Sequence, residues 1–209
     1  MKTYKITSQK DLEKFKDDFG YKTDGNAEFS YTAIFSGRLL VEGYLEIEAD
    51  YSIEAGSWIE AGSSIKAGDS IEAGDSIEAG GWIDAGCYIE AGSSIEAGGW
   101  IEAGGWIDAG SSIEAGDSYG IQAGLNIICK GTLSFGLKAF AGINPYREIA
   151  DGEKTITCSK LIGGGVVEYG ILNETGELKL DDKPEEMIEI DGKKWSKSTI
   201  KEALKVHAQ

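Results

Sequence analysis

Apolar residues recur every six positions through the middle of this chain. From Ile47 to Ser118 the sequence reads as twelve consecutive hexads, each with an isoleucine, then an acid or a lysine, then alanine, then glycine or aspartate. A two-residue insertion, Tyr119-Gly120, breaks the phase once. Further apolar residues in this phase are Phe29, Phe35, Val41, Ile121, Ile127 and Leu133.

Because six is an even number, β-strands would keep the same positions on the same face throughout the array. Isoleucine, alanine and a small residue face one way, and the acid, glycine and a Ser, Trp or Tyr face the other. An α-helix is excluded, because a six-residue repeat does not stay on one helix face and each glycine costs about 1 kcal/mol there. We expect the glycine to take a positive φ at the corner between short strands. We expect the fifth-position aspartates, Asp69, Asp75 and Asp117, to accept from turn N–H groups.

The hexad Ile83-Asp84-Ala85-Gly86-Cys87 resembles the motif of the hexapeptide-repeat family of left-handed parallel β-helices. The resemblance covers about half of the chain. It implies a mainly β fold in which three hexads form one triangular coil, and it implies the left-handed twist. We expect this β-helix over residues 29–138.

The two ends of the chain differ from the repeat. Residues 1–28 form the expected N-terminal capping region, with a helix over 9–19 that Ser8 caps and that buries Leu12, Phe15 and Phe19. Residues 139–209 form an expected C-terminal module. Its predicted strands cover 155–162, 166–172, 177–180 and 187–190, and a predicted helix covers 198–207.

Net charge is concentrated in the repeat. The chain carries -16, and residues 47–118 contain only Lys66 against 15 acids, whereas the two ends are nearly neutral. The three cysteines, Cys87, Cys129 and Cys158, form no metal-ligand or disulfide pattern. With no signal-peptide or membrane-spanning pattern, we expect a cytoplasmic protein, in a bacterial host cell if a phage encodes it.

Catalytic chemistry is not expected. Enzymes of the resembled family are mostly acyltransferases, with a histidine base on a coil, or zinc carbonic anhydrases, with three histidines on the metal. The one histidine here is His207, outside the repeat. We therefore expect no catalytic residue, no metal and no cofactor, and a divergent acyltransferase is kept as an alternative.

Stacking residues that are three hexads apart predicts three outward columns rich in acids. Aromatic residues share these faces: Trp82 should stack on Trp100 and Tyr88 on Trp106, while Trp58 stands alone. The predicted columns are Glu48, Lys66, Asp84, Glu102; Glu54, Glu72, Glu90, Asp108; and Glu60, Glu78, Glu96, Glu114. Three carboxylates per coil at ~4.8 Å is about one charge per 1.6 Å of axis, close to about 1.7 Å for duplex DNA.

These surfaces predict a binding protein rather than an enzyme. The simplest version is a nucleic-acid mimic that blocks a DNA- or RNA-handling protein, as do anti-CRISPR and other anti-defence proteins of phages and mobile elements. We expect its contacts from the acids of the columns and the four stacked aromatics, with no direct nucleic-acid or membrane binding. Two simpler interpretations stay open, namely acids that only keep the repeat soluble and aromatics that only pack within the chain. A rigid oligomeric scaffold of a virion or surface assembly, as a dimer or trimer, is the rival function.

Overall fold

The computed structural model describes residues 1–176, 187–190 and 193–196. The chain divides into two compact units, Met1–Glu177 and Leu178–Gln209. In the second unit, β26 (Met187–Ile190) and β27 (Lys193–Ser196) pair antiparallel. The expected strand at 177–180 and helix at 198–207 lie outside the described residues.

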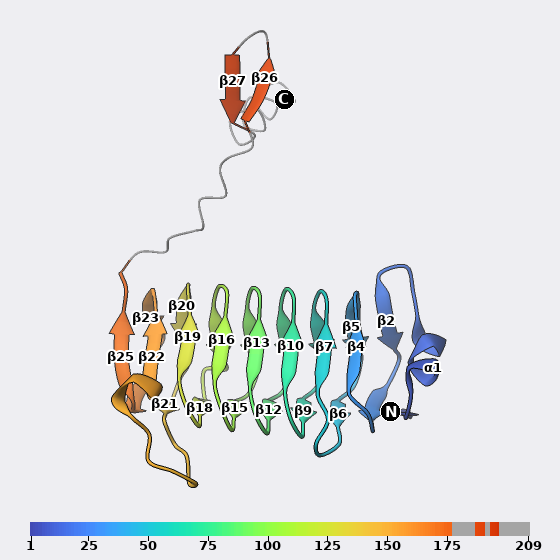
Figure 1. Cartoon of the computed structure of the whole chain (residues 1–209), viewed down its shortest axis with the longest axis horizontal. Coiled ribbons are helices and arrows are strands. Elements are labelled where there is room, and N and C mark those ends of the chain that lie inside the picture. Colours follow the sequence, from blue (N-terminus) through green and yellow to red (C-terminus); the bar gives the residue numbers. More distant parts are fainter. Residues whose placement is uncertain (177–186, 191–192, 197–209) are drawn as a thin grey trace. The chain divides into compact units, whose positions relative to one another are not determined.

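The first unit is a parallel β-solenoid of about nine coils, built from three sheets (Figure 1). Consecutive strands pass from sheet to sheet, so each coil between the first and the last contributes one strand to each sheet. The first sheet contains β1 (Thr3–Ile6), β3 (Asn26–Phe29), β6 (Leu45–Ile47), β9 (Ile65–Ala67), β12 (Ile83–Ala85), β15 (Ile101–Ala103), β18 (Ile121–Ala123), β21 (Lys138–Ala141) and β24 (Val166–Tyr169). The second contains β4 (Ala33–Phe35), β7 (Ile53–Ala55), β10 (Ile71–Ala73), β13 (Ile89–Ala91), β16 (Ile107–Ala109), β19 (Ile127–Cys129), β22 (Thr155–Cys158) and β25 (Ile171–Glu174). The third contains β2 (Gly20–Thr23), β5 (Arg38–Val41), β8 (Ile59–Ala61), β11 (Ile77–Ala79), β14 (Ile95–Ala97), β17 (Ile113–Ala115), β20 (Thr132–Ser134) and β23 (Lys160–Ile162).

The core is a set of inward columns of isoleucine and alanine. In the register, Ile71 lies beside Ile89 and Ala73 beside Ala91, three hexads further along the chain. The isoleucines and alanines are buried, while the residue between them faces outward. The predicted parallel solenoid with three strands per coil is therefore confirmed, and its stability comes from stacking apolar side chains between coils.

The repeat glycines are required for a different reason from the one predicted. Among the described glycines, positive φ angles occur at Gly20, Gly142, Gly163, Gly170 and Gly176, and not at the hexad glycines. A Cβ on a hexad glycine from Gly74 to Gly116 would instead lie less than 3.0 Å from the carbonyl oxygen of the glycine three hexads earlier. The coils approach each other backbone to backbone at these corners, so the constraint is space between coils rather than the backbone angle.

In the N-terminal coils, the residues that occupy the isoleucine positions lie two residues earlier in the sequence than predicted. Leu45 pairs with Ile65 and Ile47 with Ala67, so Ile47 takes the alanine position. Two extra residues are accommodated in the exposed turn before β7, where Asp50 has a φ of 68°. The pattern did not reveal the shift, because positions two apart in a strand face the same side.

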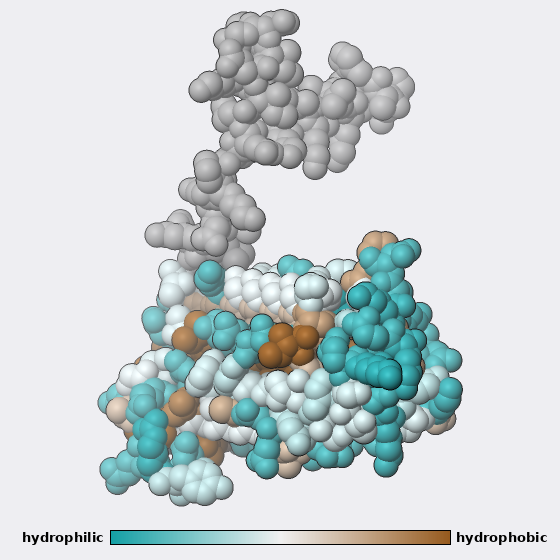
Figure 2. Space-filling model, turned by 45° about the vertical axis from the view of Figure 1, so that its right-hand side comes forward, coloured by the Kyte–Doolittle hydropathy of each residue, from teal (hydrophilic) through white to brown (hydrophobic). Residues whose placement is uncertain are grey.

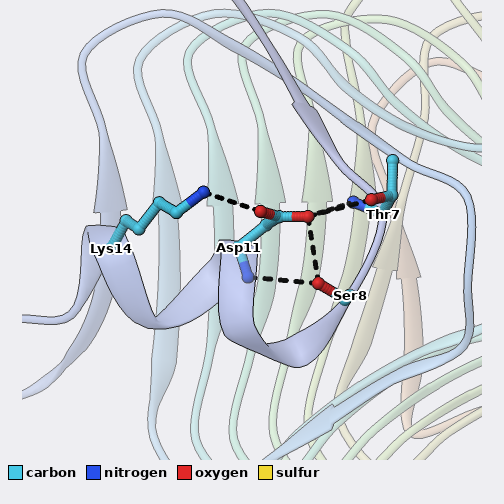
Figure 3. Close-up of polar contacts among 4 residues, drawn as sticks. All are labelled: Thr7, Ser8, Asp11 and Lys14. Carbon is cyan, nitrogen blue, oxygen red and sulfur yellow. Dashed lines mark hydrogen bonds and ion pairs between the residues drawn. The ribbon is translucent and has the colours of Figure 1, made fainter.

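A short helix closes the N-terminal end of the solenoid, but it is shorter than predicted (Figure 1). Helix α1 (Gln9–Leu12) is followed by a 3-10 helix over Glu13–Phe15. Ser8 is the N-cap, as predicted, and its hydroxyl accepts from Asp11 N (Figure 3). The Asp11 carboxylate in turn accepts from the hydroxyls of Thr7 (2.9 Å) and Ser8 (3.0 Å) and from Lys14 Nζ (2.7 Å).

The cap packs on the core through fewer side chains than expected. Leu12 is fully buried, and the Phe15 ring meets Tyr4 edge-on at 4.8 Å. Phe19 is 71% exposed, so its predicted burial is wrong. The Asp17 carboxylate accepts from Phe19 N at 2.8 Å, which stabilises a turn where the helix was expected to continue.

The three sheets continue past residue 138, where the C-terminal module was expected to begin. Strands β21 to β25 extend the parallel register, for example with Ile127 beside Ile156. The segment predicted as one strand over 155–162 is two strands, β22 and β23, that lie in different sheets, and β24 and β25 replace the predicted strand over 166–172. The six-residue sequence repeat is no longer recognisable here, but apolar side chains still fill the inward positions.

Candidate binding surface

Three outward columns run along the solenoid, and carboxylates dominate them. In the second and third sheets the parallel register reproduces the predicted columns. In the first sheet Glu46, not the predicted Glu48, lies beside Lys66, because of the two-residue shift. We call these sets the acid columns: Glu46, Lys66, Asp84 and Glu102 in the first sheet; Glu54, Glu72, Glu90 and Asp108 in the second; and Glu60, Glu78, Glu96 and Glu114 in the third.

Neighbouring carboxylates and partial burial disfavour the charged form of several column acids. Burial raises the pKa of Glu96, and the flanking Glu78 and Glu114 raise it further. Burial raises the pKa of Asp84, which Lys66 partly offsets, and burial together with Asp84 raises the pKa of Glu102. Burial likewise raises the pKa of Asp108. The columns therefore hold charge at some cost to stability, which a cationic partner would relieve.

The predicted aromatic stacks are present. Trp82 and Trp100 stack at 5.9 Å between ring centroids, with their planes 3° apart, and Tyr88 and Trp106 stack at 4.5 Å and 5°. The Tyr88 hydroxyl donates to Glu72, and this bond raises the pKa of Tyr88 to about 12. The aromatic residues therefore contact both one another and the acid columns.

Two of these aromatic positions have contacts that the sequence did not indicate. The Arg38 guanidinium lies 5.7 Å from the centroid of Trp58, which was expected to stand alone. The ring of Tyr119, from the two-residue insertion, lies 6.1 Å from Trp100. Trp100 remains 42% exposed, so it belongs to the accessible surface.

Two of the three fifth-position aspartates accept from serine hydroxyls. Ser57 Oγ donates to Asp75 at 2.8 Å across one coil, and Ser52 Oγ donates to Asp69 at 3.0 Å. The expected bonds were to backbone N–H groups, but those groups bond to carbonyl oxygens of the preceding coil, such as Asp75 N to Ser57 O. Asp117 is exposed.

Two hollows on the first sheet were not predicted. One, of about 440 Å³, lies between Tyr44 and Trp82 with Lys66 in its lining. The other, of about 360 Å³, lies beside Trp100 and Gly120. Figure 2 shows one face of the molecule, on which hydrophilic residues and residues of intermediate hydropathy surround a few separate hydrophobic patches. The only sequence signal for the second hollow was the Tyr119-Gly120 insertion.

Two of the three cysteines lie in the core of the solenoid. Cys129 and Cys158 are buried, and burial raises the pKa of Cys129 to about 12. Within residues 1–176 and the two later strands, no group of three His, Cys, Asp or Glu side chains is arranged to hold a metal ion. His207 lies outside the described residues. Among the described helices, none has the length and apolar character needed to cross a membrane.

Comparison with known proteins adds a family to this architecture. No curated protein and no solved structure matches the chain. The family model described as haemagglutinin repeat matches residues 24–86 and 88–135, which together make up more than half of the chain. These ranges coincide with strands β3 to β20 of the solenoid. The chain therefore belongs to the haemagglutinin repeat family.

Proposed function

We propose that this protein is a non-enzymatic binding protein whose acid columns engage a basic surface on another protein. The simplest form of this function is nucleic-acid mimicry that blocks a DNA- or RNA-handling protein, such as one of anti-phage or CRISPR defence. The observation that carries the proposal is the parallel register, which aligns Glu60, Glu78 and Glu96 at strand spacing on one face. The second sheet repeats this arrangement, so regularly spaced charge covers more than one side of the solenoid.

Columns of like charge lower the stability of the folded protein. Like charges opposite one another on adjacent strands are destabilising, and Ser or alternating Lys and Glu would avoid the cost. A partner with Lys and Arg at matching spacing would gain from every carboxylate and would dock at an electrostatically enhanced rate. The stacked aromatics beside the columns provide the large apolar contacts that charge alone lacks, since Trp and Tyr are enriched in interface hot spots.

The test is capture of host proteins on the immobilised chain at low and high salt, compared with a column variant. We would replace four exposed column acids by lysine so that each new lysine lies beside an acid, which changes the net charge from -16 to -8. These replacements are Glu54→Lys, Glu78→Lys, Glu90→Lys and Glu114→Lys. The proposal expects basic nucleic-acid-handling proteins to be retained at low salt, released at high salt and lost with this variant.

A charge-matched control separates the columns from net charge. It carries lysine at four exposed acids outside the columns: Asp18, Glu48, Asp117 and Glu148. Retention by this control together with loss by the column variant supports recognition of the columns. Equal retention by both variants would mean that the columns are not the binding surface.

A second function, a rigid scaffold that self-associates, is favoured by a separate observation. The last strands of the solenoid expose apolar side chains, including Val166 (59%) and Tyr169 (47%). Light scattering distinguishes the two functions, because a scaffold forms large assemblies that Val166→Ser and Trp100→Ser dissolve.

We also propose, from the resemblance and the six-residue spacing of strands β7 to β17, that the coils are those of a left-handed hexapeptide β-helix. An experimental density map of the solenoid tests this handedness directly. A right-handed solenoid in that map would contradict this assignment but not the binding proposal, because the acid columns depend only on the register between strands.

A further inference from the structure

The hollow beside Trp100 is created by a missing side chain in an outward column. Ile101 pairs with Ile121, so Gly120 lies next to Trp100 on the neighbouring coil. Ile121 pairs with Ala139, so Lys138 follows Gly120 on the next coil. Because glycine has no side chain, a gap of about 360 Å³ opens over it. We call it the Trp100 hollow.

The lining of the Trp100 hollow combines apolar surfaces with one carboxylate. Trp100 lines it together with Leu137 and Phe140. Leu137 is 57% exposed, so its side chain is accessible to a partner. Glu102, Gln122 and Lys138 also line it, and Gln122 Nε2 donates to Glu102 Oε1 at 3.0 Å. A ligand would therefore meet flat and aliphatic groups beside an anchored carboxylate.

In the described register, the Glu102 carboxylate has no cation beside it. Its neighbours across the strands are Asp84 and Gln122. Lys138, which lines the same hollow, pairs with Glu168 at 2.9 Å. Burial and Asp84 both raise the pKa of Glu102, so a cation from outside would find an unneutralised and partly desolvated carboxylate.

We propose that the Trp100 hollow binds an arginine side chain of the basic partner. This inference rests on the proposed function and names its anchoring contact. The planar guanidinium stacks on Trp100 while it donates hydrogen bonds to Glu102. The aliphatic part of the arginine packs against Leu137 and Phe140. Lysine carries the same charge but presents no planar group, so the hollow selects arginine over lysine.

The probes that test this are an arginine-rich peptide and a lysine-rich peptide of equal length and charge. Their affinities for the whole protein are measured by titration calorimetry at fixed ionic strength. A stacking contribution of about 0.5–1 kcal/mol predicts that the arginine peptide binds about two- to fivefold more tightly. Charge attraction to the acid columns alone predicts no such preference.

Two variants locate the preference. Glu102→Gln removes the carboxylate of the hollow, and Glu96→Gln removes an acid at the equivalent position of the third sheet with the same change of net charge. We expect Glu102→Gln to abolish the preference for arginine and Glu96→Gln to keep it. Trp100→Leu should also abolish it, with circular dichroism confirming that the solenoid is folded.

The outcomes separate this inference from the proposed function. Equal affinity for both peptides, weakened by salt, would overturn the arginine site and leave the acid columns as a binding surface. Binding of neither peptide would overturn both proposals. A neutral oligosaccharide that quenches Trp fluorescence while the peptides do not bind would also overturn both and would identify the hollow as a sugar site.

Discussion

Glu78 and Glu96 occupy the same register position on neighbouring parallel strands, so two carboxylates face each other across the strand spacing. Glu114 lies on the other side of Glu96. The middle carboxylate therefore has like charges on both sides, and desolvation together with these two charges raises its pKa. This relationship recurs along the acid columns.

Neutralising the middle carboxylate is expected to stabilise the fold. Glu96→Gln removes two repulsive cross-strand pairs and should raise the free energy of unfolding at pH 7 by about 0.2–1 kcal/mol. Chemical denaturation at low ionic strength measures the change, which should shrink in high salt. Glu148→Gln, at an exposed acid outside the strands, is the control and should leave stability nearly unchanged. A less stable Glu96→Gln protein would contradict this account of the columns.

Stability is expected to rise as the pH falls from neutral into the mildly acidic range. Four column acids have raised pKa values in the folded state, namely Asp84, Glu96, Glu102 and Asp108. At a pH between the unfolded-state and folded-state pKa values, the folded state therefore binds more protons than the unfolded state. Lowering the pH from about 7 towards the ordinary carboxylate pKa values near 4 therefore favours folding. Thermal unfolding measured across this range should show a higher Tm near pH 5 than at pH 7.

The same profile should turn over at lower pH. The pKa of Glu153 is held at about 2 by its bond with Arg147, and that of Asp17 is lowered by Arg38. Their contribution is present above the unfolded pKa values and is lost as the pH falls towards the folded ones. A Tm that falls steadily from pH 7 to pH 5 would mean that repulsion within the columns does not limit stability.

A methyl group at a corner glycine is expected to destabilise the coils. In Gly92→Ala the new Cβ would lie less than 3.0 Å from the carbonyl oxygen of Gly74, so the two coils must move apart. We expect a loss of about 1–3 kcal/mol in the free energy of unfolding. Gly152→Ala is the matched control, because nothing lies within 4 Å of its Cβ, and it should change stability by less than about 0.5 kcal/mol.

Much of the solenoid follows from the sequence because its period is constant. Ile71 and Ile89 are three hexads apart, and so are Trp82 and Trp100, so a fixed coil length predicts which residues are neighbours. Within the repeat, the register departs from prediction where that length changes. A fixed length would pair Ile65 with Ile47, but Ile65 pairs with Leu45. Hydrophobicity cannot show this shift, because Leu45 and Ile47 both face the core.

The Trp100 hollow depends on such a change in coil length, so only part of it is predictable from the sequence. The Tyr119-Gly120 insertion places a glycine, instead of the partner expected at the regular spacing, beside Trp100. The hollow also needs Phe140 on β21, in a region where the hexads are no longer recognisable. Composition and periodicity predict where the acids and aromatic residues lie. They do not predict the hollow, because it forms where a column position has no side chain.

The N-terminal cap is expected to contribute a large share of stability. Leu12 is fully buried, whereas Lys10 on the same short helix is exposed. Leu12→Ala should lower the free energy of unfolding by about 2–5 kcal/mol through lost burial and a cavity. Lys10→Ala should have little effect. Equal effects of the two substitutions would show that the helix does not pack on the core in solution.

Competition with duplex DNA tests the central claim most directly. The measurement is the fluorescence anisotropy of a labelled duplex bound to the captured nucleic-acid-binding partner, with increasing amounts of this protein added. The account predicts that the wild-type chain displaces the duplex, more weakly as salt rises, and that the four-lysine column variant does not. A duplex that stays bound while the protein joins the complex would contradict nucleic-acid mimicry.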